Sequence, residues 1–512
     1  IEGVAYKSIL NVRLQAYHGH IAEILEDRWA ESAGEHAEVL AYHLTRANQN
    51  TRALNYLLTA GERAAARFAN EEAAEFFGQA GQILSTLQGF PDISRWRLAA
   101  GLGDVYRATG QHSDSMAALR AGMALMETGR LNPVLRAGLY RRMGDTTRKQ
   151  GNYQSAISYF KAAILIIEEP ENEEMQLEMA RVLYGLAWAH FHQGLYEQAR
   201  EIAEQALTYA ESAESTVDLA AIENLLGGIH YSQSEWTDAS QHTRKAMVLR
   251  EQMGYTWSVA STLGNLGILA VLEGDWLKAR SFFERSLKLR EEMDDLEGQA
   301  LVHNNLGMLL RDQGDLNQAE KHFHSSLEAS KPFALSYHSA NAKLGLAYVL
   351  LLKDDPNSSR EILDQAIQLA EKIDARDILT EAHRVQVEIH IAERQYESAL
   401  KTAQTTLDRA QETGNREHQA SLWRLISVIE LAQGHIEAAK QALVPAMEIL
   451  NANSYMLELG RTHTQAACIA LAVEDNIAAD THLKTAQGIF MKLGMVGDMI
   501  YLQKLAEFGS LA

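Results

Sequence analysis

Small, large apolar and turn-forming positions recur along the chain with a step of 40 residues. The first column consists mostly of small residues, usually preceded by a large aliphatic one, and reads Ala187, Gly227, Gly267, Gly307, Ala347, Val387, Ser427 and Ala467. A turn column lies seven residues further on, at Gly194, Ser234, Gly274, Gly314, Asp354, Arg394, Gly434 and Glu474. A second small column lies five residues beyond it, at Ala199, Ala239, Ala279, Ala319, Ser359, Ala399, Ala439 and Ala479. Several columns in one register indicate an internal repeat.

The physics of two antiparallel helices explains these columns. Small residues are needed where the two backbones approach closely, and a left-handed residue at the turn ends the first helix. Large apolar residues such as Tyr196, Trp236 and Trp276 follow the turn and are expected to fill the gap to the neighbouring helix. Pro445 falls inside a predicted second helix, where we expect a kink.

Composition supports a helical chain. Only 6 prolines interrupt the 512 residues, the strong helix formers Ala, Leu, Glu, Gln and Arg dominate, and long β-branched runs are absent. A chain of this length exceeds what one compact core organises, so several domains or a repeat array are expected. The sequence predicts an all-α fold built from repeated helical hairpins.

The Leu-Gly pair, the aromatic residue after the turn and the two alanine positions resemble the tetratricopeptide repeat, with 40 residues instead of the usual ~34. The segment from Met293 to Gly307 looks like the long-repeat subclass found in Pins-type polarity adaptors and bacterial quorum-sensing receptors. The resemblance implies an α-solenoid, a right-handed superhelix of about eleven hairpins. The copies around Val387 and Ser427 lack the glycine.

The first 65 residues carry a second resemblance. This resemblance is to the junction at which a bacterial signal-transduction ATPase (STAND/AAA type) passes into its C-terminal tetratricopeptide region. It is carried by the segments Val4–Leu10, His18-Gly19-His20, His36–His43 and Ala60–Ala64. Such proteins are linked to nucleotide cyclases, kinases or transcription regulators. The resemblance implies a sensor and scaffold arm and carries over no catalytic residue. Since the chain begins with Ile1, it is expected to be a fragment or a processed product.

The spacing divides the chain into three parts. Residues 1–90 are an irregular helical segment at the junction to an upstream module. Residues 91–490 are the repeat array, with the period of 40 residues from about residue 175. Residues 491–512 hold a last helix, which caps the open apolar face of the final repeat.

Charge and motifs exclude several functions. The formal net charge of -20 argues against nucleic acid and anionic membranes, and no apolar stretch approaches the ~20 residues of a membrane helix. No phosphate-binding loop, nucleophile elbow or His-Glu-x-x-His is present, so no enzyme activity and no cofactor are predicted. The single cysteine, Cys468, reads as an inert core thiol in a reducing, cytoplasmic compartment.

The histidines share registers, with His303, His383 and His463 in one column and His242, His322 and His482 in another. Neighbours in one column lie about one hairpin apart, ~10 Å, which is too far for two of them to bind one metal ion. Pairs two residues apart, such as His18 and His20, point in different directions along a helix. No metal site is therefore expected.

A partner surface is predicted on the first helix of each hairpin. Counted from the first small column, positions −6, −3, +1 and +5 form one stripe on the inner face of the solenoid. Basic and aromatic residues, typical of binding hot spots, gather in its N-terminal half, and asparagines that suit a peptide backbone follow. The predicted groove residues are Arg141, Arg148, Arg181, Tyr184, Trp188, Asn224, Tyr231, Asn265, Asn304, Asn305, Arg311, Asn341 and Tyr348.

The leading hypothesis is a scaffold or sensor arm that binds a protein or peptide, such as an acidic segment, in this groove and regulates an attached signalling module. Alternatively, the aromatic residues pack between helices and the arginines pair with nearby glutamates. The competing functions are a small-molecule receptor, with Trp188 and Tyr231 as pocket walls, and self-association into a homo-oligomer through the N-terminal end.

Overall fold

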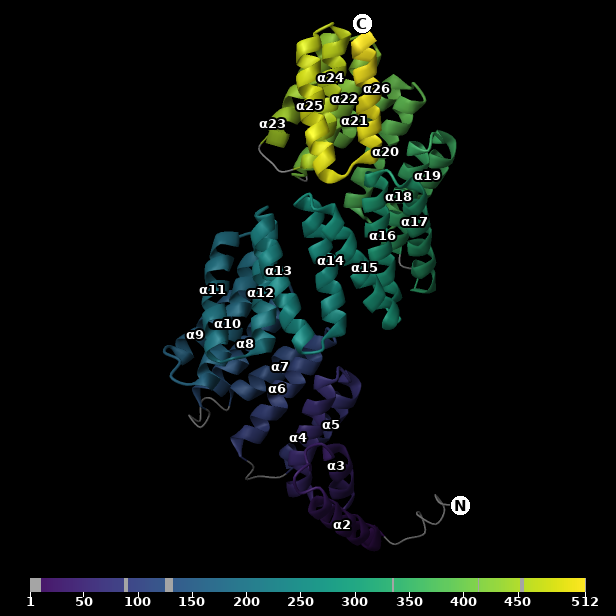
Figure 1. Cartoon of the computed structure of the whole chain (residues 1–512). Coiled ribbons are helices and arrows are strands. Elements are labelled where there is room, and N and C mark those ends of the chain that lie inside the picture. The colour runs from purple at the N-terminus through teal and green to yellow at the C-terminus, as the bar shows by residue number, and fades with distance from the viewer. Residues whose placement is uncertain are drawn as a thin grey trace, which may run out of the picture. The chain divides into compact units, whose positions relative to one another are not determined.

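The computed structural model describes residues 11–86, 91–124, 132–333, 336–412, 414–451 and 455–511. Every element in these ranges is a helix, and consecutive helices form hairpins that stack in chain order within each of two compact units, 1–233 and 234–512. The predicted all-α solenoid is thereby confirmed (Figure 1). Residues Val4–Leu10 of the junction resemblance lie outside the described residues.

The first unit contains the helices α2 to α12. Their bounds are α2 Asn11–Arg28, α3 Ala37–Arg46, α4 Asn50–Ala66, α5 Asn70–Thr86, α6 Asp92–Ala108, α7 His112–Met123, α8 Pro133–Lys149, α9 Tyr153–Ile167, α10 Glu173–His192, α11 Tyr196–Ser212 and α12 Thr216–Ser232. The pairs α4–α5, α6–α7, α8–α9 and α10–α11 pack as hairpins, each against the next.

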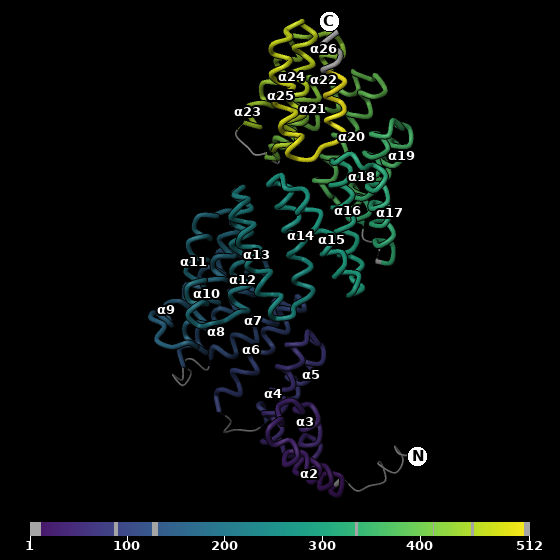
Figure 2. Tube along the Cα trace, viewed as in Figure 1, coloured from purple at the N-terminus to yellow at the C-terminus, as the bar shows by residue number. Residues whose placement is uncertain are grey.

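The second unit contains the helices α13 to α26, which Figure 2 follows from teal to yellow. Their bounds are α13 Trp236–Gln252, α14 Thr256–Leu272, α15 Trp276–Glu292, α16 Leu296–Gln313, α17 Leu316–Ser330, α18 Ser336–Leu352, α19 Pro356–Lys372, α20 Arg376–Ala392, α21 Tyr396–Glu412, α22 Arg416–Ala432, α23 Ile436–Asn451, α24 Met456–Ala472, α25 Asn476–Leu493 and α26 Val496–Leu511, with a short 3₁₀ turn at Lys331–Phe333. Helix α23 continues through Pro445.

The turn column predicted from the sequence has a left-handed backbone at every position. The glycines at 194, 274, 314 and 434 have φ between +75° and +87°, and the same conformation recurs at Ser234, Asp354, Arg394 and Glu474. The residues that follow these turns, such as Tyr196 and Trp276, are the first residues of the second helices. The repeat therefore imposes the turn geometry even where glycine is absent.

Glycines inside the first helices make room for phenylalanine rings. Phe323 of α17 is fully buried between Gly307 of α16 and Gly345 of α18. A Cβ atom added at these glycines would lie 2.8 Å and 2.2 Å from the nearest ring carbon, far inside van der Waals contact. Phe160, between Gly144 and Gly185, repeats the arrangement in the first unit. The small column thus exists because a neighbouring ring occupies the space of a side chain.

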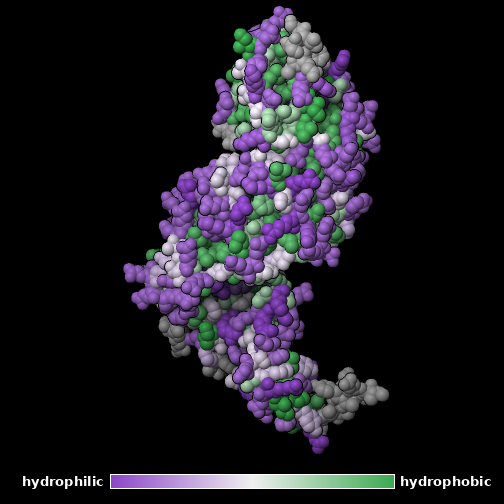
Figure 3. All heavy atoms as spheres, viewed as in Figure 1, coloured by the Kyte–Doolittle hydropathy of each residue, from purple (hydrophilic) through white to green (hydrophobic). Residues whose placement is uncertain are grey.

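Polar residues cover most of the face shown in Figure 3, which is consistent with the acidic composition. Within the described residues no helix combines the length and the apolar character that crossing a bilayer requires. The division of the chain at residues 90 and 490 stays a prediction.

Candidate functional site

The second unit closes on itself. The last helices, α25 and α26, return to α14–α16, and α26 contacts α16 directly. Trp276, Phe283 and Leu306 form one buried cluster with Phe490 and Leu493 of α25. The stack of hairpins in this unit therefore makes a closed turn.

Two glycines allow the backbones to meet where the turn closes. Gly314, which ends α16 with φ +87°, lies against Gly497 near the start of α26. A Cβ atom on Gly314 would lie 3.0 Å from the backbone nitrogen of Gly497. Gly314 is thus required both by its left-handed conformation and by the close approach of α26.

The closed turn holds two adjoining cavities of about 460 Å³ and 370 Å³, which are open to solvent and share Arg311, Asp312, Tyr348 and Arg461 in their walls. Positions −6, −3, +1 and +5 of the predicted inner stripe supply much of the lining. These lining residues are Leu272, Met308, Asp312, Tyr348, Leu352, Glu381, Arg384, Glu388, Ser421, Arg424, Val428, Arg461, Thr464 and Cys468. The cavity volumes are those of ligand sites in proteins.

Tyr348 lies at the centre of the charged lining. The guanidinium carbons of Arg311 and Arg384 lie 4.8 Å and 5.0 Å from its ring centroid, so the ring is held between two cations. Its hydroxyl donates a hydrogen bond of 3.3 Å to Glu388, and the side chain is only 4% exposed. Burial, followed by the Glu388 charge, raises the pKa of Tyr348, so the phenol stays protonated at neutral pH.

Ion pairs fix the other arginines of the lining. Arg384 donates two hydrogen bonds of 2.7 Å to Glu381, in the bidentate geometry that orients a guanidinium, and it also pairs with Glu388. Although burial opposes it, the charge of Arg384 holds the pKa of Glu381 well below its usual range. His418 of α22 contacts the same carboxylate at 3.0 Å. These contacts join α20 to α22.

The closing helices add two further pairs. Arg424 Nε of α22 lies 2.5 Å from Glu458 of α24, and Arg461 Nε of α24 lies 3.4 Å from Asp498 of α26. Glu417 differs from its neighbours, since among the described residues no ion pair reaches its carboxylate. Its side chain is exposed at the lining of the second cavity, where partial desolvation by the neighbouring residues raises its pKa.

Cys468 also lines the first cavity and is partly exposed, so its prediction as a core thiol needs correction. It lies at position +1 of the inner stripe, and its side chain lines the first cavity. Burial raises the pKa of its thiol, against a hydrogen bond with Tyr501 of α26. The thiol is therefore protonated at neutral pH and poorly nucleophilic.

The basic residues predicted for the groove in the first unit take part in ion pairs, two of which join consecutive hairpins. Arg141 Nε of α8 lies 2.6 Å from Glu178 of α10, and Arg181 of α10 lies 3.1 Å from Asp218 of α12. Arg148 lies 3.6 Å from Asp145 and 5.9 Å from the ring of Trp188. Tyr184 and Trp188 are partly buried and pack against the core.

The other predicted residues differ in burial. Tyr231 and Asn265 are exposed, and Asn224, Asn305 and Asn341 are half-buried. Asn304 is 2% exposed, and its amide donates to the sulfur of Met308 at 3.7 Å. Of the 13 predicted residues, Arg311 and Tyr348 line the cavities. Partner binding at the remaining residues stays a prediction.

The structure brings histidines together that the sequence reasoning kept apart. His303 and His322, on the two helices of one hairpin, have their Nδ1 atoms 2.9 Å apart, and His463 and His482 repeat this distance. His18 contacts His43 at 2.8 Å. The expectation from the histidine columns considers only neighbours in the same column, one hairpin apart. Two of these pairs share a spacing of 19 residues, and this spacing is the sequence signal for a contact between the two helices of one hairpin.

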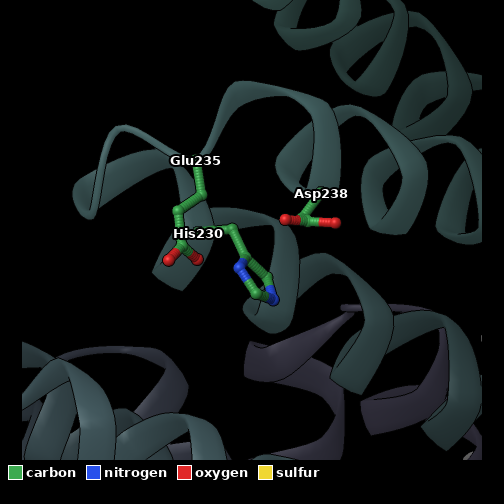
Figure 4. A group of neighbouring side chains, drawn as sticks. All are labelled: His230, Glu235 and Asp238. Atoms are coloured by element: carbon green, nitrogen blue, oxygen red, sulfur yellow. The ribbon is translucent and has the colours of Figure 1, made fainter. Parts of the chain in front are cut away.

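Figure 4 shows one group of three potential metal ligands, His230, Glu235 and Asp238. His230 belongs to the first unit, and Glu235 and Asp238 belong to the second. The boundary between the units falls inside this group, and we derive no metal site from it.

The chain contains tetratricopeptide repeats: residues 135–212, 218–292 and 298–372 match the family profile of the tetratricopeptide repeat. No curated protein matches the sequence.

Among solved structures, the apo form of RapI is similar at 14% identity and a TM-score of 0.46, over 78% of this chain and 97% of that chain. Aspartyl phosphate phosphatase F from Bacillus subtilis is similar at 13% identity and a TM-score of 0.47, over 69% and 93%. The apo quorum sensor NprR from B. thuringiensis is similar at 12% identity and a TM-score of 0.43, over 77% and 97%.

Proposed function

We propose that the protein is a non-catalytic interaction scaffold whose second unit binds a peptide in the cavities inside its closed turn. The observation that carries this proposal is the lining: an aromatic ring held between two guanidinium groups, with hydrogen-bonding side chains from consecutive hairpins around it. Arginine and tyrosine dominate binding hot spots. A row of donors and acceptors with the period of the repeat suits an extended peptide, whose backbone groups also recur regularly.

The lining is also organised before any ligand arrives. Arg384 is held by two carboxylates and by the Tyr348 ring, so little side-chain entropy remains to be lost on binding. Apolar side chains such as Met308 and Leu352 stay exposed beside these charges, at 39% and 45%. A concave surface with fixed charges and uncovered apolar groups favours binding of a ligand over a purely structural role.

An affinity selection tests the proposal. The immobilised full chain is incubated with an equimolar mixture of random hexapeptides, and retained peptides are identified by mass spectrometry. Leu352→Trp fills the cavity from an exposed position, whereas Ile477→Trp makes a similar change at a residue of α25 that is 84% exposed and outside both cavities. The wild type and Ile477→Trp should retain the same peptides, and Leu352→Trp should lose them. Retention by Leu352→Trp equal to that of the wild type would refute the proposal.

A small-molecule receptor is the second candidate, and the volumes of the two cavities, about 460 Å³ and 370 Å³, favour it. A small ligand that binds only the folded chain raises its melting temperature by mass action. Thermal-shift screening separates the candidates: a shift by a compound that Leu352→Trp abolishes, with no peptide retained, would establish the receptor instead.

From the resemblance of its first 65 residues, we propose that the chain is the sensor arm of a cytoplasmic, bacterial signal-transduction ATPase and regulates that attached module. We propose that an acidic protein segment binds along the first unit at Arg141, Arg148 and Arg181. We also propose that the chain can self-associate into a homo-oligomer, which light scattering would detect.

A further inference from the structure

The charges that line the two cavities are unequal. Together the walls contain six carboxyl groups, those of Asp312, Glu381, Glu388, Glu417, Glu458 and Asp498. They contain four guanidinium groups, those of Arg311, Arg384, Arg424 and Arg461, and no lysine. A concave lining with an acidic excess concentrates the potential inside the cavity, because low-dielectric walls focus the field. The cavity as a whole therefore attracts positive charge.

Glu417 accounts for one of the two surplus carboxyl groups, and the other arises because Glu381 and Glu388 share Arg384. Each of its acidic neighbours has a cationic partner: Glu381 pairs with Arg384, and Glu458 pairs with Arg424. Glu417 has no such partner among the described residues. It lies in the first turn of α22 and lines the second cavity. Among the neighbouring charges, His418 has the largest effect and lowers the pKa of Glu417, as Arg384 also does, whereas the carboxylates of Glu458 and Glu381 raise it.

The energetic consequence follows from the surroundings. A carboxylate in a concave lining that has no cationic partner gains more from a bound cation than one that is already paired. A cation bound there would complete the alternation of charges around the turn, in which every other acidic group of the lining is already paired. The guanidinium groups beside Tyr348 can donate hydrogen bonds to carbonyl or carboxylate oxygens from the rest of the same ligand.

We infer that the ligand of this cavity carries a primary ammonium group, either a peptide N-terminus or a lysine side chain, which pairs with Glu417. The inference rests on the proposed peptide-binding function and specifies its ligand. It also separates the two units: the basic stripe at Arg141, Arg148 and Arg181 suits an acidic segment, whereas the cavity of the second unit selects a cation.

The experiment compares three mixtures of random hexapeptides on the full chain: one with free N-termini, one with acetylated N-termini, and one without lysine. Loss of retention on acetylation would assign the ammonium group to the N-terminus, and loss in the mixture without lysine would assign it to the side chain. The most strongly retained hexapeptide is then titrated calorimetrically into the wild type and two variants.

Glu417→Gln removes the charge and keeps the shape of the side chain. Glu412→Gln is the matched control, because Glu412 is an exposed residue of α21 outside both cavities. The inference predicts about tenfold weaker binding for Glu417→Gln, as expected for one partly screened charge pair, and unchanged binding for Glu412→Gln. Glu417→Lys should reverse the preference and retain acidic hexapeptides, which a merely unfolded variant could not do.

Two outcomes are distinguishable. If the wild type retains hexapeptides that have neither a free N-terminus nor a lysine, or if Glu417→Gln binds within twofold of the wild type, the ammonium assignment is wrong and peptide binding stands. If the wild type retains none of the hexapeptides from any mixture, the peptide-binding function itself is wrong, and this inference falls with it.

Discussion

Replacing Gly345 with alanine tests how the hairpins of the second unit pack. The added methyl group would lie 2.2, 2.3 and 2.8 Å from three carbons of the Phe323 ring. The ring cannot retreat, because Gly307 bounds its other face with a space that a methyl group would also overfill. Helix α18 must therefore move by about 1 Å to restore van der Waals contact at ~3.5 Å.

The expected magnitude follows from two opposing effects. Overfilling a packed core costs roughly 1–3 kcal/mol, and we take the upper part of this range because the ring is confined on both faces. Alanine in a helix interior gains up to about 1 kcal/mol over glycine. The net loss of unfolding free energy is therefore about 2 kcal/mol, which lowers the urea midpoint by about 0.7–1 M for a slope of about 2–3 kcal/mol/M.

The assay is urea unfolding followed by circular dichroism and by tryptophan fluorescence together, because repeat arrays can unfold in steps. Gly264→Ala is the matched control: Gly264 also lies inside a first helix, α14, but no atom lies within 4 Å of the added methyl group. Its midpoint should stay equal or rise. A midpoint for Gly345→Ala at or above that of Gly264→Ala would refute the packing argument.

A double-mutant cycle adds an internal check. Phe323→Leu removes the ring that the new methyl group meets, so Gly345→Ala should cost less than about 1 kcal/mol in that background. An equal cost in both backgrounds would mean that the effect arises elsewhere in α18.

Two further predictions concern the closure of the turn and its dependence on pH. Gly314→Ala should loosen α26 and speed its amide hydrogen exchange, whereas Gly434→Ala, with a similar φ of +83° and open space around it, should strain the backbone equally and leave α26 unchanged. Burial and the neighbouring His322 lower the pKa of His303 to about 4, and burial lowers that of His322. Because the unfolded chain then binds more protons, stability should fall as the pH drops from about 6.5 to 4, and His303→Gln with His322→Gln should flatten this slope in urea midpoints.

The repeat itself could be predicted because each column of residues is needed for a contact or a turn within one hairpin or between adjacent hairpins. The small column provides room for a ring from the neighbouring helix, and the turn column marks left-handed residues, even at Arg394 and Glu474, whose residue types do not favour this conformation. The inner stripe follows from helical geometry alone, and Met308, Tyr348 and Arg384 of that stripe line the cavities. These features depend only on contacts between adjacent hairpins.

The closure of the second unit could not be predicted in the same way. Each hairpin of a solenoid is rotated slightly relative to the one before it, and the closure depends on the total rotation over all hairpins from α16 to α26. A column of the repeat describes only the contact between adjacent hairpins and does not give this total. Asp498 and Tyr501 of α26 were therefore not predicted as lining residues. Sequence reasoning located the basic stripe in the first unit, but the ion partners Glu178 and Asp218 become visible only when the hairpins are stacked.

Photo-crosslinking measures most directly whether the closed turn binds a peptide. Tyr501→benzoylphenylalanine places a photoreactive group at the first cavity, where an exposed aromatic ring already stands, and Ile477→benzoylphenylalanine places the same group on the outer surface of α25. After irradiation with the hexapeptide mixture, we predict covalent peptide adducts at position 501 and none at position 477. Equal labelling at both positions, or labelling at 477 alone, would contradict the proposal that the cavity is the binding site.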